Sequence, residues 1–401
     1  MPAIVIVGAG QAGASLAAKL RSLGHDGPIT LIGEEPAPPY QRPPLSKGYL
    51  LGEIGLERIY LRAPSFWDDQ RITLRTGQRV TAIDRAARTI RVGDEVIPYD
   101  QLALTTGARP RRLPAAIGGD LNGVYTVRTL ADVDAMAPEF RAGRRLLIVG
   151  GGYIGLEAAA VGAKLGLYVT VIEMAPRILQ RVAAPETSAY FRKLHGAHGV
   201  TIRENTGLDR LTGEGRVTGA VLSDGTTIAA DFVIVGIGIA PAIALAEEAG
   251  LAIDNGIRTD AFGRTSDPMI WAAGDCASFP HKGGRLRLES VGNAIDQAEI
   301  VAANMLGAET PYEAKPWFWS DQYDVKLQIA GLNTGYDRIV TRAGEAGAVS
   351  FWYYAGTTLL AVDALNDARA YMIGKRLIDM DRSPTPAEIA APDTDLKALL
   401  R

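Results

Sequence analysis

The sequence predicts an α/β fold made of two similar units in tandem, followed by a C-terminal α+β domain. The chain has 401 residues, enough for two or three domains of about 100–200 residues each. A glycine-rich pattern occurs twice, each time after a short apolar run and before an alanine-rich stretch. From about Pro316, short β-type runs separated by glycine-containing turns replace this alternation. The repeated pattern indicates strand–helix units with parallel sheets, and the change of pattern indicates a separate domain.

The first unit begins with the apolar run Ala3–Val7, which is short enough for a buried strand. It leads directly into G-A-G-Q-A-G (residues 8–13), and the Ala- and Leu-rich stretch that follows predicts a helix to about Leu23. A second strand, Ile29–Ile32, is followed by Glu34, which lies 21 residues after the last glycine of the pattern. Strand, G-x-G-x-x-G, helix, strand and acid is the order of a dinucleotide-binding fold.

The second unit repeats this order. Leu146–Val149 leads into G-G-G-Y-I-G (residues 150–155), and an Ala-rich helix is expected to about Leu165. The strand Tyr168–Ile172 ends at Glu173, 18 residues after the last glycine. Two copies in full context argue against chance, so each unit is predicted to hold one dinucleotide.

Both units close in the same way. An acid, a strand and a glycine follow one another in residues 100–107 and again in residues 231–238. Before each closing strand lies a β-rich stretch with a turn signal, at residues 93–94 and 224–225. These stretches predict an antiparallel excursion in each unit.

The spacing of the glycines has a physical reason. The first allows a tight turn, the second lets backbone N–H groups reach a pyrophosphate, and the third lets the helix lie close to the strand. The acid after the second strand hydrogen-bonds a ribose and repels a 2′-phosphate. Glu173 therefore favours NADH over NADPH, although Arg177 and Arg181 lie close enough in sequence to reverse this preference.

Two further segments point to a flavin. The loop Tyr40–Lys47 is either a proline-stiffened surface loop or a rigid support that presents Arg42 to phosphate and Lys47 to a flavin ring. The stretch 265–275 predicts a strand that delivers Ala-Gly-Asp, where Asp275 would accept a hydrogen bond from a ribityl hydroxyl.

The composition limits the other classes of function. Apolar residues make up 47% and charged residues 22% of the chain, which excludes wholesale disorder. The net charge of −3 lacks the basic surplus that non-specific binding of nucleic acid requires. The single cysteine and four scattered histidines argue against a metal centre, so redox chemistry would need an organic cofactor. No uncharged apolar run of about 18 residues and no signal segment occur, so a cytoplasmic protein without membrane contact is expected.

Together these motifs resemble the oxygenase-coupled NADH-dependent ferredoxin reductases, the family that includes putidaredoxin reductase and palustrisredoxin reductase. The resemblance covers essentially the whole chain and implies a glutathione-reductase-like fold. Its motifs are the Y-x-R-P-P-L-S-K loop, both glycine turns, A-A-G-D, E-S-V-G-N-A at 289–294 and W-F-W-S-D-Q at 317–322. The implied domains are an FAD-binding domain in two segments (1–112 and 242–316), an NADH-binding domain (113–241) and the C-terminal α+β domain (317–401).

The resemblance also assigns the contacts of the two dinucleotides. The FAD contacts would be Gly8, Gly10, Gly13, Ala14, Glu34, Arg42, Lys47, Val80, Thr106, Gly107, Arg128, Asp275 and Val291. The NADH contacts would be Gly150, Gly152, Ile154, Gly155, Glu157, Glu173, Arg181 and Gly238.

Three residues receive catalytic roles by resemblance: Lys47, Glu157 and Trp319. Lys47 and Glu157 would pair beside the flavin and orient the nicotinamide, and a cation there also favours reduced flavin. Glu157 lies two residues after the third glycine, on the first turn of the predicted helix, so stabilisation of the helix end is the alternative. Trp319 would lie near the isoalloxazine ring or, like Trp317, would be a core aromatic.

The implied reaction is hydride transfer from NADH to FAD, followed by single-electron transfer to a 2Fe–2S ferredoxin that feeds a cytochrome P-450 or related oxygenase. We expect a monomer that docks the acidic ferredoxin transiently and electrostatically, unless the cations concerned are merely solvated. The candidate docking cations are Lys282, Arg285, Arg287, Lys315 and Lys326.

The cysteine content separates this reading from related ones. A single cysteine excludes a disulfide reductase, and Ser46 stands where NADH oxidases and peroxidases of this fold carry a redox cysteine. Cys276 is expected to be a small buried residue rather than a nucleophile. The remaining alternatives are a flavoprotein that reduces oxygen, rubredoxin or a quinone, and a flavin-bound interaction protein like the apoptosis-inducing factors.

In the C-terminal domain we expect a small sheet and two helical segments. The predicted strands are Val325–Ile329, Arg338–Thr341, Val349–Tyr354 and Thr358–Val362, and the helical segments are Asn366–Asp379 and the region near Thr394–Arg401.

Overall fold

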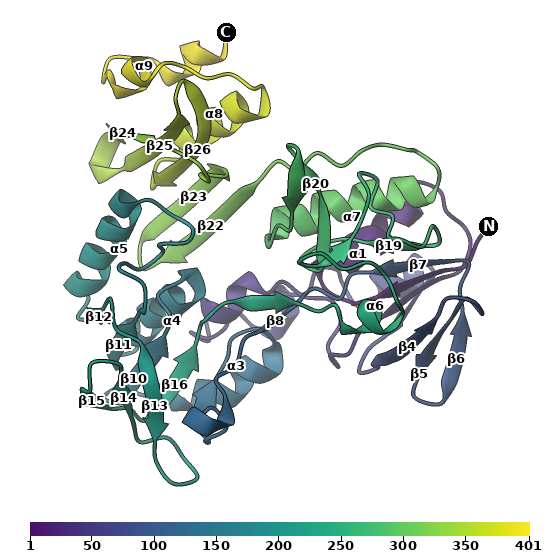
Figure 1. Ribbon diagram of the computed structural model, residues 1–401, viewed down its shortest axis with the longest axis horizontal. Coiled ribbons are helices and arrows are strands. Elements are labelled where there is room, and N and C mark those ends of the chain that lie inside the picture. The colour runs from purple at the N-terminus through teal and green to yellow at the C-terminus, as the bar shows by residue number, and fades with distance from the viewer. The chain divides into compact units, whose positions relative to one another are not determined.

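The computed structural model describes residues 1–401, which form two compact units. The first comprises residues 1–41, 56–109 and 239–316, and the second comprises residues 42–55, 110–238 and 317–401. Each unit contains a five-stranded parallel sheet, and the second unit also contains a five-stranded antiparallel sheet. The predicted α/β fold class, with two similar units and a C-terminal α+β domain, is confirmed (Figure 1).

The parallel sheet of the first unit has the strand order β19–β7–β1–β2–β3. All residues of β1 are buried, as expected for a parallel strand covered on both faces. Helices α1 (Gln11–Ser22) and α7 (Val291–Met305) pack against each other. The strands are, in sheet order, Ile270–Ala272, Gln101–Leu104, Ile4–Val7, Ile29–Ile32 and Ile72–Arg75.

The second unit repeats this arrangement with the order β12–β11–β10–β16–β9. Helix α4 (Tyr153–Lys164) follows β10 as α1 follows β1. In both copies, the predicted strands and helix ends lie within one residue of those observed. The strands are, in sheet order, Thr201–Arg203, Tyr168–Ile172, Arg145–Val149, Phe232–Val235 and Val124–Tyr125.

An antiparallel excursion occurs in each unit, as predicted, and residues 93–94 and 224–225 are turns within them. In the first unit it consists of β4 (Val80–Asp84), β5 (Thr89–Val92) and β6 (Glu95–Pro98). In the second unit it consists of β13 (Leu208–Thr212), β14 (Gly219–Leu222) and β15 (Thr227–Ala229).

The C-terminal sheet contains the four predicted strands and one that the sequence does not predict, β22 (Trp317–Gln322). W-F-W-S-D-Q has no regular alternation of apolar and polar residues, so it lacks the periodic strand signal, although its aromatic residues favour strands. The segment pairs with β23 along its whole length. The sheet order is β22 (Trp317–Gln322), β23 (Val325–Gly331), β26 (Thr358–Leu365), β25 (Val349–Ala355) and β24 (Arg338–Ala343).

The helical part of this domain differs from the prediction only at its end. Helix α8 (Ala368–Asp379) confirms the first predicted segment. Where a helix was expected near residues 394–401, the chain forms a short 3-10 turn, Leu396–Leu400. Helix α9 (Pro386–Ala390), capped by Thr385, precedes it and is not predicted, because its five residues are too few for a periodic pattern.

The C-terminal sheet is covered on both faces, because successive residues of β25 enter different cores. Tyr353 packs with Leu156 of α4 and with Phe191 of α5 (Pro185–Ala197). Its neighbours Trp352 and Tyr354 pack beneath α8. The sheet therefore lies against the helix that follows the second glycine turn.

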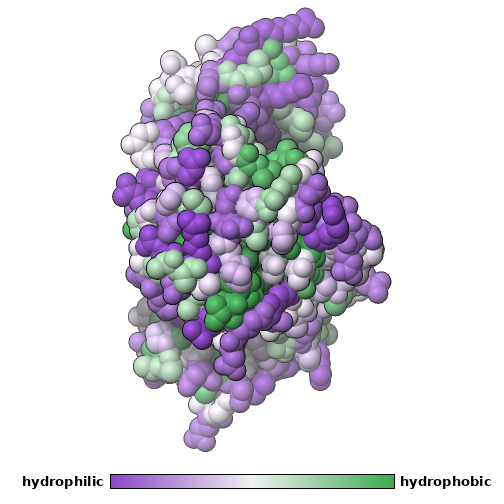
Figure 2. Space-filling model, turned by 90° about the vertical axis from the view of Figure 1, so that its right-hand side faces the viewer, coloured by the Kyte–Doolittle hydropathy of each residue, from purple (hydrophilic) through white to green (hydrophobic).

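No helix combines the length and the apolar character that a membrane span requires. On the face drawn in Figure 2, hydrophilic residues predominate and hydrophobic residues form small separate groups.

Candidate functional site

The first glycine turn leaves room for a ligand at one position only. Gly8 has a φ of +114°, and a Cβ on it would lie 2.2 Å from the carbonyl oxygen of Thr105. A Cβ on Gly13 would lie 2.0 Å from the carbonyl oxygen of Gly8. By contrast, a Cβ on Gly10 would meet nothing within 4 Å. The chain's own packing requires Gly8 and Gly13, whereas Gly10 borders open space at the start of α1.

The second turn has the same construction. Gly150 has a φ of +108°, and its Cβ would lie 2.3 Å from the carbonyl oxygen of Gly236. A Cβ on Gly155 would approach Gly150 to 2.4 Å, while one on Gly152 would meet nothing within 4 Å. Gly10 and Gly152 are also the N-caps of α1 and α4, and neither helix start has a side-chain cap. Open space beside uncapped helix N–H groups fits a pyrophosphate in both units.

The two ribose acids are held differently. Glu34 is exposed and lies 3.2 Å from Arg109 and 3.6 Å from Arg79. Glu173 is half-buried, and its carboxylate accepts hydrogen bonds from the N–H groups of Gly151 at 2.7 Å and Ala175 at 2.8 Å. Backbone N–H groups therefore orient Glu173. Glu34 instead forms ion pairs with two arginines that are not part of the glycine motif.

Most predicted FAD residues lie at one edge of the first sheet. Gly8 follows β1, Glu34 follows β2, Thr106 follows β7 and Asp275 follows β19. Because all these strands are parallel, their carboxyl ends meet at the same edge, where α/β proteins bind ligands.

Near Asp275, a buried amide supports the fit of a further polar group. The N–H of Gly274 donates to Gln297 Oε1 at 2.8 Å, and Gln297 Nε2 is buried without a protein partner. Gln297 lies on α7, whose first residue is Val291. A ligand oxygen would satisfy this donor.

The other predicted FAD residues are placed as follows. Ala14 is buried on α1, Val80 is buried at the start of β4, and Gly107 has a φ of +71°. Thr106 donates to the carbonyl oxygen of Ala242 at 2.7 Å. Arg42, Lys47 and Arg128 belong to the second unit, where Arg42 donates to the carbonyl oxygen of Arg128 at 2.6 Å.

The predicted NADH residues gather at the corresponding edge of the second sheet. Gly150 follows β10, Glu173 follows β11 and Gly238 follows β16. A Cβ on Gly238 would lie 3.8 Å from the guanidinium of Arg181, so these two residues are neighbours. Ile154, at the start of α4, is 45% exposed, which is unusual for an apolar side chain beside a buried helix face.

Lys47 and Glu157 form an ion pair, and two hydroxyl groups complete it. Glu157 is 5% exposed, and its Oε1 lies 3.0 Å from Lys47 Nζ. Ser46 donates to Glu157 Oε2 at 2.6 Å, and Ser320 donates to Oε1 at 2.7 Å. Glu157 is the fifth residue of α4 and not part of its first turn, so the prediction of that position is wrong. Helix-end stabilisation therefore does not explain this acid.

The charge of Glu157 depends on its partners. Burial raises the pKa of this carboxyl group, and Lys47 is the largest influence that lowers it again, followed by Ser46 and Ser320. Glu157 is therefore a nearly buried carboxylate whose negative charge is stabilised by one cation and two hydroxyl donors. Such a carboxylate can attract a positively charged ring or accept a hydrogen bond from a ring that carries an amide.

Sequence reasoning missed Ser46, Ser320 and Thr105 as members of these sites. Ser46 and Ser320 stand next to the predicted Lys47 and Trp319, and that adjacency was the available signal. Thr105 Oγ1 donates to the carbonyl oxygen of Gly8 at 2.8 Å and so holds the first glycine turn.

Trp319 lies on β22, where successive side chains point to opposite faces of the sheet. Trp317 and Trp319 are half-buried and stack with ring centroids 5.4 Å apart. Ser320, one residue on, has the opposite orientation and reaches Glu157. The two tryptophans thus form an aromatic pair that is only partly covered.

The candidate docking cations divide into two groups. Lys282, Lys315 and Lys326 are exposed. Arg285 donates to the carbonyl oxygens of Thr259 and Ser278. Arg287 donates to the carbonyl oxygen of Asp275 and to the carboxylate of Glu289. These two arginines hold their own unit together, which leaves the lysines as available cations.

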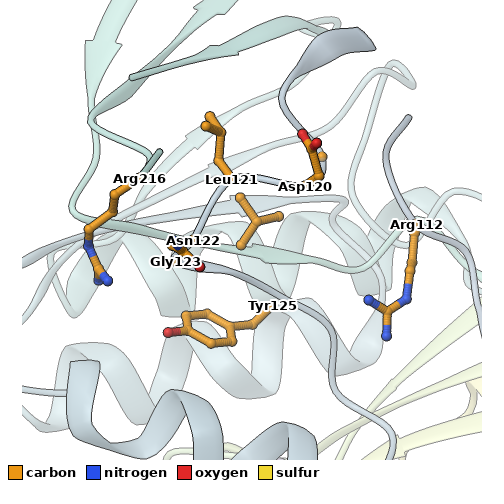
Figure 3. A pocket seen from close by; sticks show the side chains of 9 residues that line it. Arg112, Asp120, Leu121, Asn122, Gly123, Tyr125 and Arg216 are labelled. Carbon is orange, nitrogen blue, oxygen red and sulfur yellow. The ribbon is translucent and has the colours of Figure 1, made fainter. Parts of the chain in front are cut away.

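Two other features lie outside the predicted sites. Cys276 is fully buried, and burial raises the pKa of its thiol, so the prediction of a structural cysteine is confirmed. A pocket of about 450 Å³ in the second unit lies between Arg112 and Arg216, with Tyr125 between them (Figure 3). None of the predicted dinucleotide residues lines it, and Arg216 is already paired with Glu139.

Comparison with known proteins gives a consistent result. Residues 2–298 match the pyridine nucleotide-disulphide oxidoreductase family, and residues 317–400 match the reductase C-terminal family. The chain is 44% identical over 399 residues to rhodocoxin reductase from Rhodococcus erythropolis, covering 98% of this chain and 93% of that protein. It is 46% identical over 383 residues to a ferredoxin–NAD(P)+ reductase from Sphingomonas sp, covering 94% and 92%. The crystal structure of the covalent putidaredoxin reductase–putidaredoxin complex has a TM-score of 0.96 at 40% identity, covering 100% of this chain and 98% of that chain.

Proposed function

Because this chain belongs to the pyridine nucleotide-disulphide oxidoreductase family, we propose that it is an FAD-dependent ferredoxin reductase that takes electrons from NADH for an oxygenase system. The resemblance inferred from the motifs is confirmed. The observation that carries the proposal is the duplicated turn, with open space at Gly10 and at Gly152. The only cysteine is buried, so the chain cannot act as a disulfide reductase of this family.

The division of work between cofactor and protein follows from the residues present. FAD, when bound, accepts a hydride and releases electrons singly. The first glycine turn and Asp275 bind FAD in this proposal, and the second turn with Glu173 binds NADH and rejects the 2′-phosphate of NADPH. Lys47 and Glu157 act beside the flavin ring and orient the nicotinamide, and Trp319 lies near the ring. The protein supplies orientation and charge rather than an acid–base catalyst.

The proposed partner is a 2Fe–2S ferredoxin, and the similarity of this chain to a ferredoxin–NAD(P)+ reductase and to the reductase of the putidaredoxin reductase–putidaredoxin complex supports a ferredoxin. We propose that docking is transient and electrostatic and that the exposed cations Lys282, Lys315 and Lys326 contribute to it, because ferredoxins of this class are acidic. We also propose a monomer in the cytoplasm, where NADH is available. The proposed domains are 1–112 with 242–316 for FAD, 113–241 for NADH, and 317–401, in agreement with the start of the C-terminal family match at residue 317.

Anaerobic reduction tests the proposal. The purified protein should be yellow with bound FAD, should be bleached by stoichiometric NADH, and should then reduce a 2Fe–2S ferredoxin from an added panel. A colourless protein that stays colourless with added FAD would overturn the flavoprotein assignment. Rapid peroxide formation, with no ferredoxin reduced, would instead identify an oxidase. Ferredoxin reduction that declines steeply with salt supports electrostatic docking, and a flat response contradicts it.

A further inference from the structure

A continuous chain of hydrogen bonds connects Glu157 to the molecular surface through the C-terminal domain. Ser320 and Gln322 lie two residues apart on β22, on the same face, and both are fully buried. Gln322 Nε2 donates to Ser320 Oγ at 3.0 Å, and Ser320 donates to Glu157. At the other end, Gln322 Oε1 lies 2.8 Å from His195 Nε2 on α5.

Beyond His195, the series of hydrogen bonds continues to Tyr323 near the molecular surface. Tyr323 Oη lies 3.2 Å from His195 Nδ1. The Tyr323 ring stacks on the exposed His198, with centroids 3.7 Å apart. The five residues Glu157, Ser320, Gln322, His195 and Tyr323 are called the Glu157 chain below.

The donors and acceptors that are available give all hydrogen bonds of the Glu157 chain the same direction. Gln322 Oε1 only accepts, so His195 Nε2 carries the proton and Nδ1 accepts from Tyr323. Gln322 Nε2 only donates, so Ser320 Oγ accepts and its own proton points at Glu157. Every donor therefore points toward the carboxylate, and hydrogen bonds aligned in this way strengthen one another. Burial, together with the neighbouring His198, lowers the pKa of His195, which agrees with a neutral ring.

We propose that Ser320, Gln322 and His195 are positioning residues that keep Glu157 charged and paired with Lys47. The reason is electrostatic: at 5% exposure the carboxylate has almost no water, and aligned donors replace it. The Glu157 chain does not conduct protons, because the Gln322 amide cannot pass a proton on without losing its amide form. The proposal deepens the proposed function, since it makes the C-terminal domain part of the Lys47–Glu157 site.

The proton affinity of Glu157 tests the proposal directly. Infrared difference spectra of the FAD-loaded protein between acid and alkaline pH report the carboxyl band, which Glu157→Gln identifies by its loss. In Ser320→Ala we expect the pKa of Glu157 to rise by about one pH unit, or about tenfold in proton affinity. Ser350→Ala is the matched control, because Ser350 is also a fully buried serine of this sheet, and its hydroxyl accepts a hydrogen bond from Trp352 rather than donating to Glu157. An unchanged pKa in Ser320→Ala, or an equal rise in Ser350→Ala, overturns the proposal.

Two variants of His195 separate positioning from packing. His195→Gln keeps a donor for Gln322, whereas His195→Met removes it. We expect the pKa of Glu157 to rise in the Met variant, by less than in Ser320→Ala, and to stay close to its starting value in the Gln variant. If both variants leave that pKa unchanged and alter only the melting temperature, His195 is a packing residue and the proposal fails. The infrared readout does not use NADH or ferredoxin, so its failure and a failure of the proposed function are distinguishable.

Discussion

Replacement of Lys47 by methionine is the sharpest test of the ion pair. Methionine keeps most of the apolar stem but removes the charge that lies 3.0 Å from Glu157 Oε1. Lys47 is 18% exposed and Glu157 is 5% exposed, so solvent screens this pair only weakly. We expect flavin reduction by NADH to slow far more than FAD retention weakens.

Loss of one preorganised charged donor from a water-poor site slows chemistry by about 100-fold to 1,000-fold. The folded state loses less than the roughly 3–5 kcal/mol typical of a broken buried pair. The reason is that Glu157 keeps its hydrogen bonds from Ser46 and Ser320, and that burial already favours uptake of a proton. About 1–2 kcal/mol is the expected loss.

Stopped-flow absorbance at the flavin band, with anaerobic NADH, measures the reduction rate, and the flavin-to-protein absorbance ratio measures FAD content. Lys164→Met is the matched control, because Lys164 pairs with Glu53 at 2.6 Å while both side chains are more than half exposed. It should change neither quantity. A reduction rate in Lys47→Met within a factor of two of the unmodified protein would remove Lys47 from the mechanism.

The remaining predictions concern the turns, the coenzyme and a buried acid. Gly10→Ala should fold normally, because the new Cβ meets no protein atom, but it should hold FAD about tenfold more weakly, because that Cβ enters the open space where the pyrophosphate is proposed to bind. Gly8→Ala should fail to fold, because its φ is +114° and its Cβ would meet the backbone. Equal soluble yields of the two variants would refute this contrast. Glu173→Ala should reduce the preference for NADH over NADPH by about tenfold in kcat/KM, because it removes the carboxylate that would accept a charge-assisted hydrogen bond from the ribose and repel a 2′-phosphate. An unchanged ratio would contradict that role of Glu173. Burial raises the pKa of Asp363 to about 6, above its ordinary value of about 3.9, so folding favours the protonated form. Its contribution of about 3 kcal/mol is complete below about pH 4 and is lost as the pH rises to about 6. Asp363→Asn should flatten this part of the unfolding profile measured by denaturant titration, and a profile of unchanged slope would contradict the shift.

The agreement between prediction and structure is best where the fold depends on local sequence. The strand Tyr168–Ile172 and the ends of α1 and α4 are set by apolar runs and glycines that lie next to them in the chain. Strand β22 was not predicted because its residues show no regular alternation, and its pairing with β23 is visible only in the folded chain. Arg285 and Arg287 looked like surface cations, and only the folded chain shows that carbonyl oxygens bind them.

The amino-acid sequence alone determined that two pyrophosphate turns occur in one polypeptide, because each turn is a contiguous pattern with a steric need for glycine at Gly8 and Gly150. The environment of Glu157 was decided by tertiary structure. Its partners Ser46 and Ser320 lie 111 residues before it and 163 residues after it, its partner Lys47 is the neighbour of Ser46, and no local pattern relates them. A charge is stabilised by whatever surrounds it in space, so the state of this carboxylate emerges only when the loop, the helix and the C-terminal sheet have packed together.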